Sequence, residues 1–124
     1  MIFGIGTDLV IIDRIAKVFN KFGDKFSQRI LSANESEQFE SNKNKITFLA
    51  KRFAAKEAFS KALGTGIRGF SFQDIEIHHT ELGRPNIRAH GKCLAVLNEN
   101  KITKIHLSVS DEVDLAQAFV VIEF

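Results

Sequence analysis

The sequence has no tryptophan and no tyrosine, and only one proline, one cysteine and one methionine. The aromatic residues are therefore twelve phenylalanines, which lack a polar group and are expected to fill space in the core. The single cysteine, Cys93, excludes an intramolecular disulfide and a multi-cysteine zinc site, and we expect it to be a small buried residue on a helix. No apolar run approaches the roughly 20 residues of a membrane span, and Met1–Gly6 lacks the basic region of a signal peptide. We therefore expect a soluble, cytoplasmic protein without membrane contact.

An excess of charge of one sign is also missing. Seventeen Lys and Arg residues against fifteen Asp and Glu residues give a formal net charge of +2 among 124 residues. This balance is too mild for a duplex nucleic-acid binder, and no nucleic-acid partner is expected. The length predicts a single domain over 1–124, and a domain of this size often gains stability by oligomerising.

The apolar periodicity predicts an α+β domain without βαβ regularity. An apolar run with two glycines predicts a buried first strand that stops at Thr7–Asp8. Asp13 is predicted to cap the first helix, and Ser32 with Glu35 fits a capping box that opens the second helix. The predicted helices cover 14–22, 33–40, 46–63 and 91–99. Besides the first strand, which lies in the apolar run 2–10, the predicted strands cover 72–78, 86–89, 105–109 and 116–122.

Two acids stand among apolar residues. At about 100° per residue, Glu57 falls on the same helical stripe as Ala50 and Phe53, so it is expected to face inward. A carboxylate there must meet a cation one turn away, find hydrogen-bond donors or take up a proton. Asp8 lies between two apolar runs and is either a local cap or a ligand. Together Asp8 and Glu57 could hold a hard divalent cation such as Mg²⁺, since no His or Cys is near either in sequence.

Cations gather along the same long helix and are followed by a Gly-Thr-Gly loop, Gly64–Gly66. Such charges are commonly just a solvated face, and one Gly-x-Gly is weak evidence for a phosphate site. Their combination with a candidate metal carboxylate indicates an anionic, phosphate-bearing ligand. These cations are Lys43, Lys45, Lys51, Arg52, Lys56 and Lys61.

A second basic stripe consists of Arg14, Lys17, Lys21 and Lys25. If the first helix persists, these residues share one face. They form either a solvated face or a docking face for an acidic protein. The four histidines have no metal-ligand spacing and are expected to be structural or surface residues.

Several motifs resemble those of the holo-acyl-carrier-protein synthases. The segment Gly4-Ile5-Gly6-Thr7-Asp8-Leu9-Val10 followed by Arg14-Ile15 resembles their N-terminal signature, and 52–66, RFAAKEAFSKALGTG, resembles their central helix nearly residue for residue. Gly83-Arg84-Pro85 and Ser108-Val109-Ser110-Asp111-Glu112 resemble the later elements. The resemblance covers the whole chain in order and length.

The resemblance implies a 4′-phosphopantetheinyl transferase-like fold, with a small antiparallel sheet packed on a long helix. It also implies a homotrimer with active sites between protomers. The implied activity is Mg²⁺-dependent transfer of 4′-phosphopantetheine from coenzyme A to a serine of an apo-acyl carrier protein. That reaction releases 3′,5′-ADP and activates the carrier for fatty acid biosynthesis.

The resemblance also implies roles for individual residues. Asp8 and Glu57 match the magnesium ligands, and Arg14 with the stripe after it matches the face that meets the carrier protein. Many family members have His at the position of Asp111, whereas others have Asp, as this chain does. Glu57, Lys61 and Asp111 are the catalytic candidates, and the serine proton could go to Glu57, to Asp111 through a water, or to a water on the metal. The residues expected to contact coenzyme A are Lys45, Arg52, Lys61, Gly64, Thr65, Gly66, Arg84 and Pro85.

Three other functions compete with this interpretation. A phosphate- or nucleotide-binding module without catalysis would need the basic helix but not the paired acids. A nucleic-acid binder is disfavoured because no Tyr or Trp is present for base stacking. A purely structural trimer-forming domain would leave Asp8 and Glu57 unexplained.

Overall fold

The computed structural model describes all residues, 1–124. It contains five α-helices, five strands and one short 3₁₀ helix, and this α+β composition confirms the predicted fold class. The order is β1 (Ile2–Ile11), α1 (Ile12–Phe22), α2 (Asp24–Ile30), α3 (Ala33–Ser41), α4 (Lys45–Leu63), η1 (Phe72–Asp74), β2 (Ile75–His79), β3 (Pro85–Ala89), α5 (Gly91–Glu99), β4 (Lys104–Asp111) and β5 (Leu115–Glu123).

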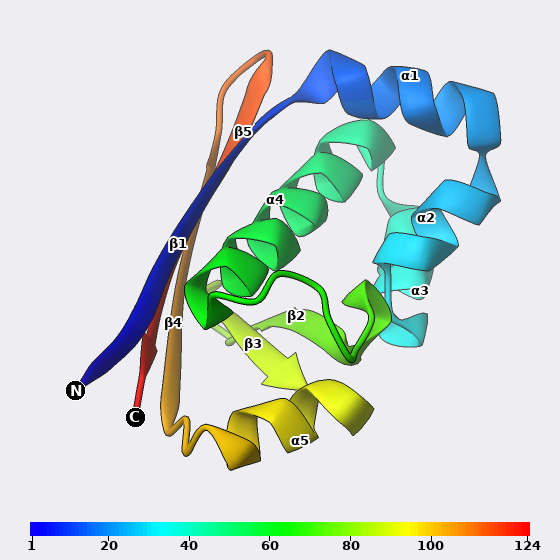
Figure 1. Ribbon diagram of the computed structural model, residues 1–124. Coiled ribbons are helices and arrows are strands. Elements are labelled where there is room, and N and C mark those ends of the chain that lie inside the picture. The colour runs from blue at the N-terminus through cyan, green and yellow to red at the C-terminus, as the bar shows by residue number, and fades with distance from the viewer.

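The strands form two antiparallel sheets. The larger has the order β1-β5-β4, and the smaller is the hairpin of β2 and β3. Helix α4 lies along one face of the larger sheet, with α1, α2 and α3 on its far side (Figure 1). The two chain ends lie side by side, where the Phe124 N–H donates to the Met1 carbonyl.

Small residues allow α4 to approach β1 closely. A Cβ atom on Gly4 would overlap the carbonyl oxygen of Ala62, and one on Gly6 would overlap that of Ala58. From the neighbouring strand, Ala116 and Ala118 are fully buried. Because glycine and alanine keep the backbones this close, α4 and the middle of β1 can share polar side chains.

The start of the chain differs from the prediction. Strand β1 does not stop at Thr7–Asp8 but continues to Ile11, because both residues pair with β5, Thr7 opposite Phe119 and Asp8 opposite Ala118. Asp13 does not cap α1, which starts one residue before it and has no side-chain cap. Instead, Asp13 forms an exposed ion pair with Lys17, one turn further along.

Helix α2 was not predicted. Gly23 has φ = 59°, a left-handed conformation that ends α1 and lets the chain restart as a separate helix. The basic stripe is therefore broken, since Lys25 belongs to α2 and not to α1. Downstream, the predicted strand over 72–78 begins as the 3₁₀ helix and becomes extended only at Ile75.

Other predictions for the fold are confirmed. Ser32 and Glu35 form the capping box of α3. Helix α4 ends at Gly64, which adopts the left-handed conformation with φ = 83°. Cys93 is a buried free thiol in α5, and burial raises its pKa to about 12. None of the helices combines the length and the hydropathy that a bilayer-spanning segment requires.

Candidate functional site

Asp8 and Lys61 join β1 to α4. The Lys61 ammonium donates to the Asp8 carboxylate at 3.1 Å and to the Thr7 carbonyl at 3.0 Å. The Asp8 side chain is only 15% exposed, whereas that of Lys61 is 54% exposed. Asp8 is thus a strand residue that faces the helix, and it does not act as a local cap.

Glu57 lies one turn before Lys61 on the same helix. Burial raises the pKa of its carboxyl group, the charge of Asp8 raises it further, and the charge of Lys61 opposes both. The hydrogen bonds of Lys61 go to β1 and not to Glu57. The structure therefore shows no direct ion pair of Glu57 with Lys61, and the charge of Asp8 acts on the Glu57 carboxyl group across the α4–β1 contact.

The side of α4 that faces α3 carries a second group of charges, which the sequence analysis did not recognise. Glu35 and Lys56 are fully buried, and their charged atoms are 2.6 Å apart. Arg52 lies one turn before Lys56, with its Nε 3.2 Å from the other Glu35 oxygen. Lys56 also donates to the carbonyls of Ile30 and Phe72. Lys56 was expected among the cations that surround an anionic ligand, but it is satisfied within the core and cannot reach one.

A polar cavity of about 590 Å³ opens beside the first half of α4. Lys51 forms an ion pair across it with Asp111 at 3.4 Å. The pKa of His79, also on the wall, is lowered by partial burial and by the charges of Arg52 and Lys51. The cavity is lined by Gln38, Ser41, Asn42, Asn44, Thr47, Phe48, Lys51, Arg52, His79 and Asp111.

Asp111 is therefore separated from Glu57 and Lys61 within one chain. It ends β4, and β5 lies between β4 and β1, which carries Asp8. Lys45, at the start of α4, pairs with Glu40 at 3.6 Å and lies over the ring of Phe39. The cavity and the Asp8–Glu57–Lys61 group occupy different stretches of α4.

The loop after α4 uses its N–H groups internally. The Gly64 N–H donates to the Lys61 carbonyl, and the Gly66 N–H donates to the Ser60 carbonyl. Both bonds cap the C-terminal end of the helix. The Thr65 hydroxyl is exposed and donates to the Gly66 carbonyl. The N–H groups of these two glycines are therefore already bonded within the chain, and the contact of this loop with coenzyme A stays a prediction.

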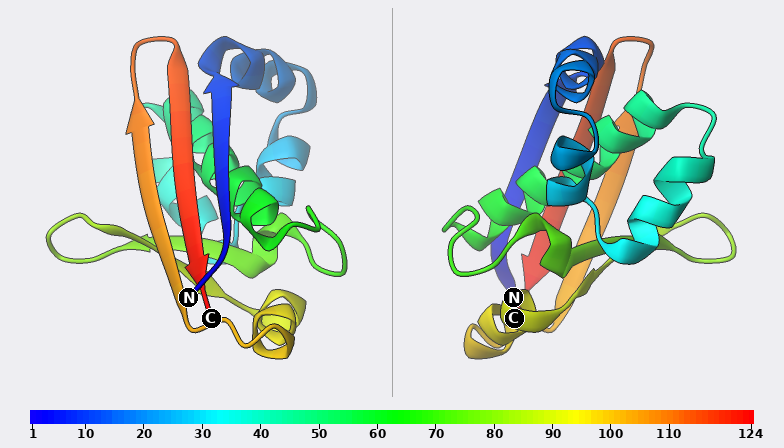
Figure 2. Two further views of the ribbon diagram at one scale, coloured as in Figure 1. Left: turned by 60° about the vertical axis from the view of Figure 1, so that its left-hand side comes forward. Right: turned by 90° about the vertical axis from the view of Figure 1, so that its right-hand side faces the viewer.

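Arg84 and Pro85 lie at the tip of the β2–β3 hairpin. The Arg84 N–H donates to the Thr80 hydroxyl, and Pro85 pairs with His79 at the start of β3. The hairpin projects from the body of the chain on the side opposite the loop after α4 in both views of Figure 2. The residues predicted to contact coenzyme A thus lie on two separate flanks of one protomer.

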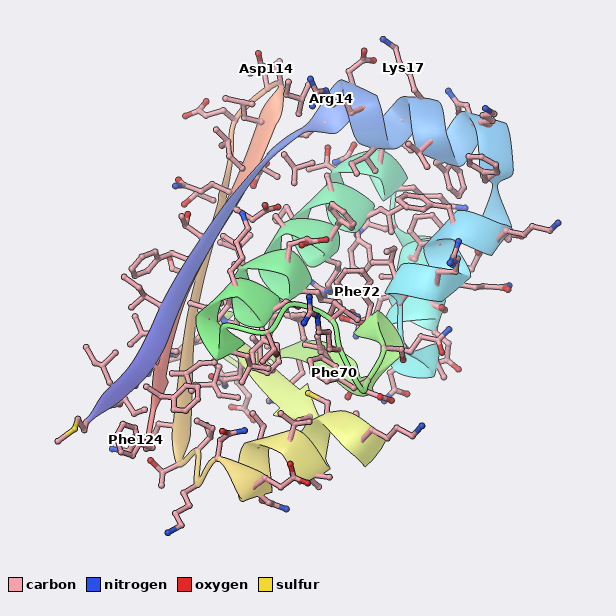
Figure 3. The ribbon with its side chains drawn as sticks, in the orientation of Figure 1. Arg14, Lys17, Phe70, Phe72, Asp114 and Phe124 are labelled. Atoms are coloured by element: carbon pink, nitrogen blue, oxygen red, sulfur yellow. The ribbon has the colours of Figure 1, made fainter.

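Arg14 and Lys17 project from the outer side of α1, away from α4 (Figure 3). Lys21, further along, lies over the ring of Phe22, which is 52% exposed. Next to them, α1 and α2 enclose a groove of about 580 Å³ with an apolar floor and a basic rim. Its lining residues are Val18, Phe22, Lys25, Phe26, Gln28, Arg29 and Gln73. Arg29 follows Lys25 by four residues, so the sequence could have predicted that these two cations share one face of a helix.

Comparison with known proteins agrees with this architecture. Residues 4–120 match the model of the 4′-phosphopantetheinyl transferase superfamily. A holo-[acyl-carrier-protein] synthase of Vibrio cholerae is 48% identical over 124 residues, covering 99% of this chain and 98% of the relative. The crystal structure of the Neisseria meningitidis synthase superposes with a TM-score of 0.97 at 48% identity and covers 100% of both chains. A Bacillus anthracis synthase in complex with CoA (3′,5′-ADP) has a TM-score of 0.83 at 40% identity, with 99% of this chain and 97% of that chain covered.

These matches span nearly the whole chain, and they agree on a class of transferase. The chain belongs to the 4′-phosphopantetheinyl transferase superfamily and, within it, to the holo-[acyl-carrier-protein] synthases.

Proposed function

We propose that the chain transfers 4′-phosphopantetheine from coenzyme A to a serine of an apo-acyl carrier protein. The observation that carries the proposal is the convergence of Asp8, Glu57 and Lys61 at the α4–β1 contact. It is supported by the relatives, which are named for this activity and include a synthase in complex with CoA (3′,5′-ADP). The carrier protein of fatty acid biosynthesis, in the cytoplasm, is the expected acceptor.

In the proposed reaction, the serine hydroxyl oxygen attacks the β-phosphorus of coenzyme A. The new bond joins this oxygen to phosphorus, and the bond from phosphorus to the bridging oxygen breaks. The electron pair leaves with 3′,5′-ADP, and the serine proton passes to a base. Such a reaction depends mainly on alignment and charge neutralisation.

Asp8 and Glu57 suit Mg²⁺. Both offer hard carboxylate oxygens, and Mg²⁺ is commonly held by one or two carboxylates together with waters and phosphate oxygens. Burial and, after it, the charge of Asp8 raise the pKa of Glu57, and a bound cation would offset both effects. When bound, Mg²⁺ would supply positive charge to the pyrophosphate oxygens and to the leaving group.

Lys61 would act beside this pair. Two of its three N–H donors are directed to Thr7 and Asp8, so the ammonium is fixed against β1. Its half-exposed position leaves the third donor for a phosphate oxygen. Lys61 therefore orients Asp8 and adds a positive charge where negative charge develops.

We also propose that the active enzyme is a homotrimer with sites between protomers. The sheet face opposite α4 exposes Ile5, Leu9 and Phe119 by 60%, 63% and 46%, an apolar surface suited to association with another copy. Assembly would let one protomer supply Asp8, Glu57 and Lys61 while a neighbour supplies Arg52, Asp111 and the Arg84–Pro85 hairpin. Light scattering should give three times the chain mass, and a monomeric mass in the active enzyme would contradict the trimer.

Transfer is tested by incubating the protein with coenzyme A, Mg²⁺ and an apo-acyl carrier protein. Mass spectrometry should show the carrier gaining roughly 340 Da, the mass of the transferred group. Chelation of Mg²⁺ should stop the reaction, and added Mg²⁺ should restore it. Binding of coenzyme A without any mass gain on the carrier would favour the non-catalytic binding module instead.

The face of α1 and α2 is proposed to receive the carrier protein. The basic side chains there are Arg14, Lys17, Lys21 and Lys25, and Lys21 lies over the partly exposed ring of Phe22. Reversing the charge of Arg14 and Lys17 together should raise the KM for the carrier about tenfold. The KM for coenzyme A should stay unchanged, and an equal rise in both constants would contradict this assignment.

A further inference from the structure

Glu35 is a buried carboxylate whose two oxygens contact different partners. One oxygen accepts from the Ser32 N–H at 2.9 Å and from the Lys56 ammonium at 2.6 Å. The other accepts from the Ile77 N–H at 3.0 Å and lies 3.2 Å from Nε of Arg52. Glu35 is fully buried and comes from a different helix than the two cations. It therefore fixes α4 to α3 and β2 at a point next to the polar cavity.

Arg52 is held on three sides. Its Nη2 donates to the Gln38 side-chain oxygen at 3.2 Å, and its guanidinium carbon lies 4.4 Å from the centre of the Phe48 ring. The contact of Nε with Glu35 is an ion pair and not an aligned hydrogen bond. The guanidinium remains part of the cavity wall. An arginine has five N–H donors, so some of them remain free for a ligand beside the contacts with Gln38 and Glu35.

This arrangement differs from that of the other cation on the same wall. Lys51 is about one-third exposed and pairs with Asp111, which is equally exposed. Such a pair is hydrated and easily rearranged. Arg52 is only 6% exposed, so its position depends on what surrounds it. A prearranged donor binds an anion without first losing side-chain freedom.

We propose that Glu35 is a positioning residue for coenzyme A binding. It orients Arg52 so that the free edge of the guanidinium meets a phosphate at the nucleotide end of the coenzyme. The inference rests on the proposed function, in which Arg52 is one of the residues that contact coenzyme A. Glu35 touches neither the substrate nor the reacting atoms and acts only through Arg52.

A purely structural role for Glu35 predicts something different. In the cluster, one carboxylate balances two cations and leaves one net positive charge. If Glu35 only balanced the charge of the two cations, removing it would destabilise the fold, and removing Lys56 as well would restore the stability. If Glu35 orients Arg52, the second change would repair stability but not binding.

The test compares Glu35→Gln, Lys56→Met and the double variant with the native enzyme. Glu35→Gln should raise the KM for coenzyme A and the Kd for 3′,5′-ADP about tenfold, the loss expected when a charged contact no longer holds its partner. The kcat at saturating coenzyme A should stay within about twofold, since the reacting groups are untouched. The Kd is measured by calorimetry with 3′,5′-ADP and needs no turnover.

The double variant, Glu35→Gln with Lys56→Met, separates the two roles. It has the native cluster charge, so its melting temperature should recover relative to Glu35→Gln, while its Kd for 3′,5′-ADP stays about tenfold raised. Lys56→Met alone keeps the Glu35–Arg52 contact and should keep the native Kd. If Glu35→Gln does not fold, the Kd for 3′,5′-ADP of the double variant is compared with that of Lys56→Met, and this comparison decides between the positioning role and the structural role.

Three results would overturn the inference. They are a native Kd in a folded Glu35 variant, a Kd that recovers together with stability in the double variant, and a native Kd in Arg52→Met. The native enzyme, assayed in parallel, tests the proposed function separately. Absence of transfer to any apo carrier protein would overturn that function, whereas the calorimetric result would still decide the role of Glu35.

Discussion

Helix α4 carries two charged groups on different sides that differ in almost every physical respect. On one side, Lys56 is fully buried, and all its contacts are to protein acceptors. On the other side, the charge of Asp8 acts unfavourably on the partly buried carboxylate of Glu57, beside a half-exposed Lys61. Lys56 and Glu57 are consecutive residues, so a rotation of about 100° around the helix axis separates a completed network from an incomplete one.

The difference separates charges that only stabilise the fold from charges that can bind a ligand or take part in a reaction. A buried charge that has all its partners stabilises a particular packing and has no capacity left for a ligand. A pair of like charges held together by the fold retains unfavourable energy that an incoming cation or phosphate-bearing ligand can relieve. The basic residues along α4 look alike in sequence, and only their partners separate the two groups.

The largest effect is expected at the incomplete group. Asp8→Asn keeps the shape but removes a charge, and it should lower kcat by at least about 10³-fold, or about 4 kcal/mol in the activation free energy. The free energy of unfolding should change by less than about 1 kcal/mol, because the lost ion pair with Lys61 is partly solvated. Steady-state transfer assays and urea denaturation measure the two quantities.

Glu99→Gln, which removes an exposed acid from α5, serves as the matched control and should leave both quantities unchanged. An Asp8→Asn enzyme that keeps a tenth or more of the native kcat would show that the incomplete group is not the reaction centre. The contrast between the two sides of α4 would then lose its functional meaning.

The completed group should respond in the opposite way. Lys56→Ala leaves the buried Glu35 carboxylate without its closest cation and should lower the free energy of unfolding by about 3–5 kcal/mol. The molecules that remain folded should retain much of the native kcat, because Lys56 contacts neither Asp8 nor a ligand. Urea denaturation with a kcat corrected for the folded fraction checks this. A large loss of kcat without loss of stability would contradict the division.

Much of this arrangement could be predicted from local sequence patterns. The capping box at Ser32, the long helix that ends at Gly64 and the inward position of Glu57 all follow from patterns within a few residues. The pairing of Asp8 with Glu57 stays a prediction, made partly from resemblance, and the close α4–β1 contact through Gly4 and Gly6 supports it physically.

The errors have a common physical origin. Helix α2 was missed because it has only seven residues and depends on the left-handed Gly23. Lys56 was grouped with ligand-binding cations because its partners, Glu35 and two carbonyls, come from distant parts of the chain. The distance of Asp111 from Glu57 within one protomer reflects the strand order, which no local pattern records. Long-range partners, and not residue types, were the missing information.

A third charged pair lies outside both groups, and its removal is expected to change the stability of the protein least. His106 and Glu123 face each other across β4 and β5 at 2.6 Å and are both substantially exposed. The hydrogen bond to His106 lowers the pKa of Glu123 in the folded protein below its usual value of 4.5. A carboxyl group with a lowered folded-state pKa stabilises the protein above its unfolded pKa, and this contribution is lost as the pH falls through the folded-state value.

Replacing His106 by Gln should therefore reduce the loss of stability that occurs as the pH falls below about 4.5, since the pKa of Glu123 would return toward its ordinary value. The change should be much smaller than that of Lys56→Ala, because water screens an exposed pair and a buried one has no such screening. Urea denaturation across this pH range checks both variants side by side. If His106→Gln altered stability as strongly as Lys56→Ala, burial would not be what separates strong from weak charged pairs here, and the contrast along α4 would need another cause.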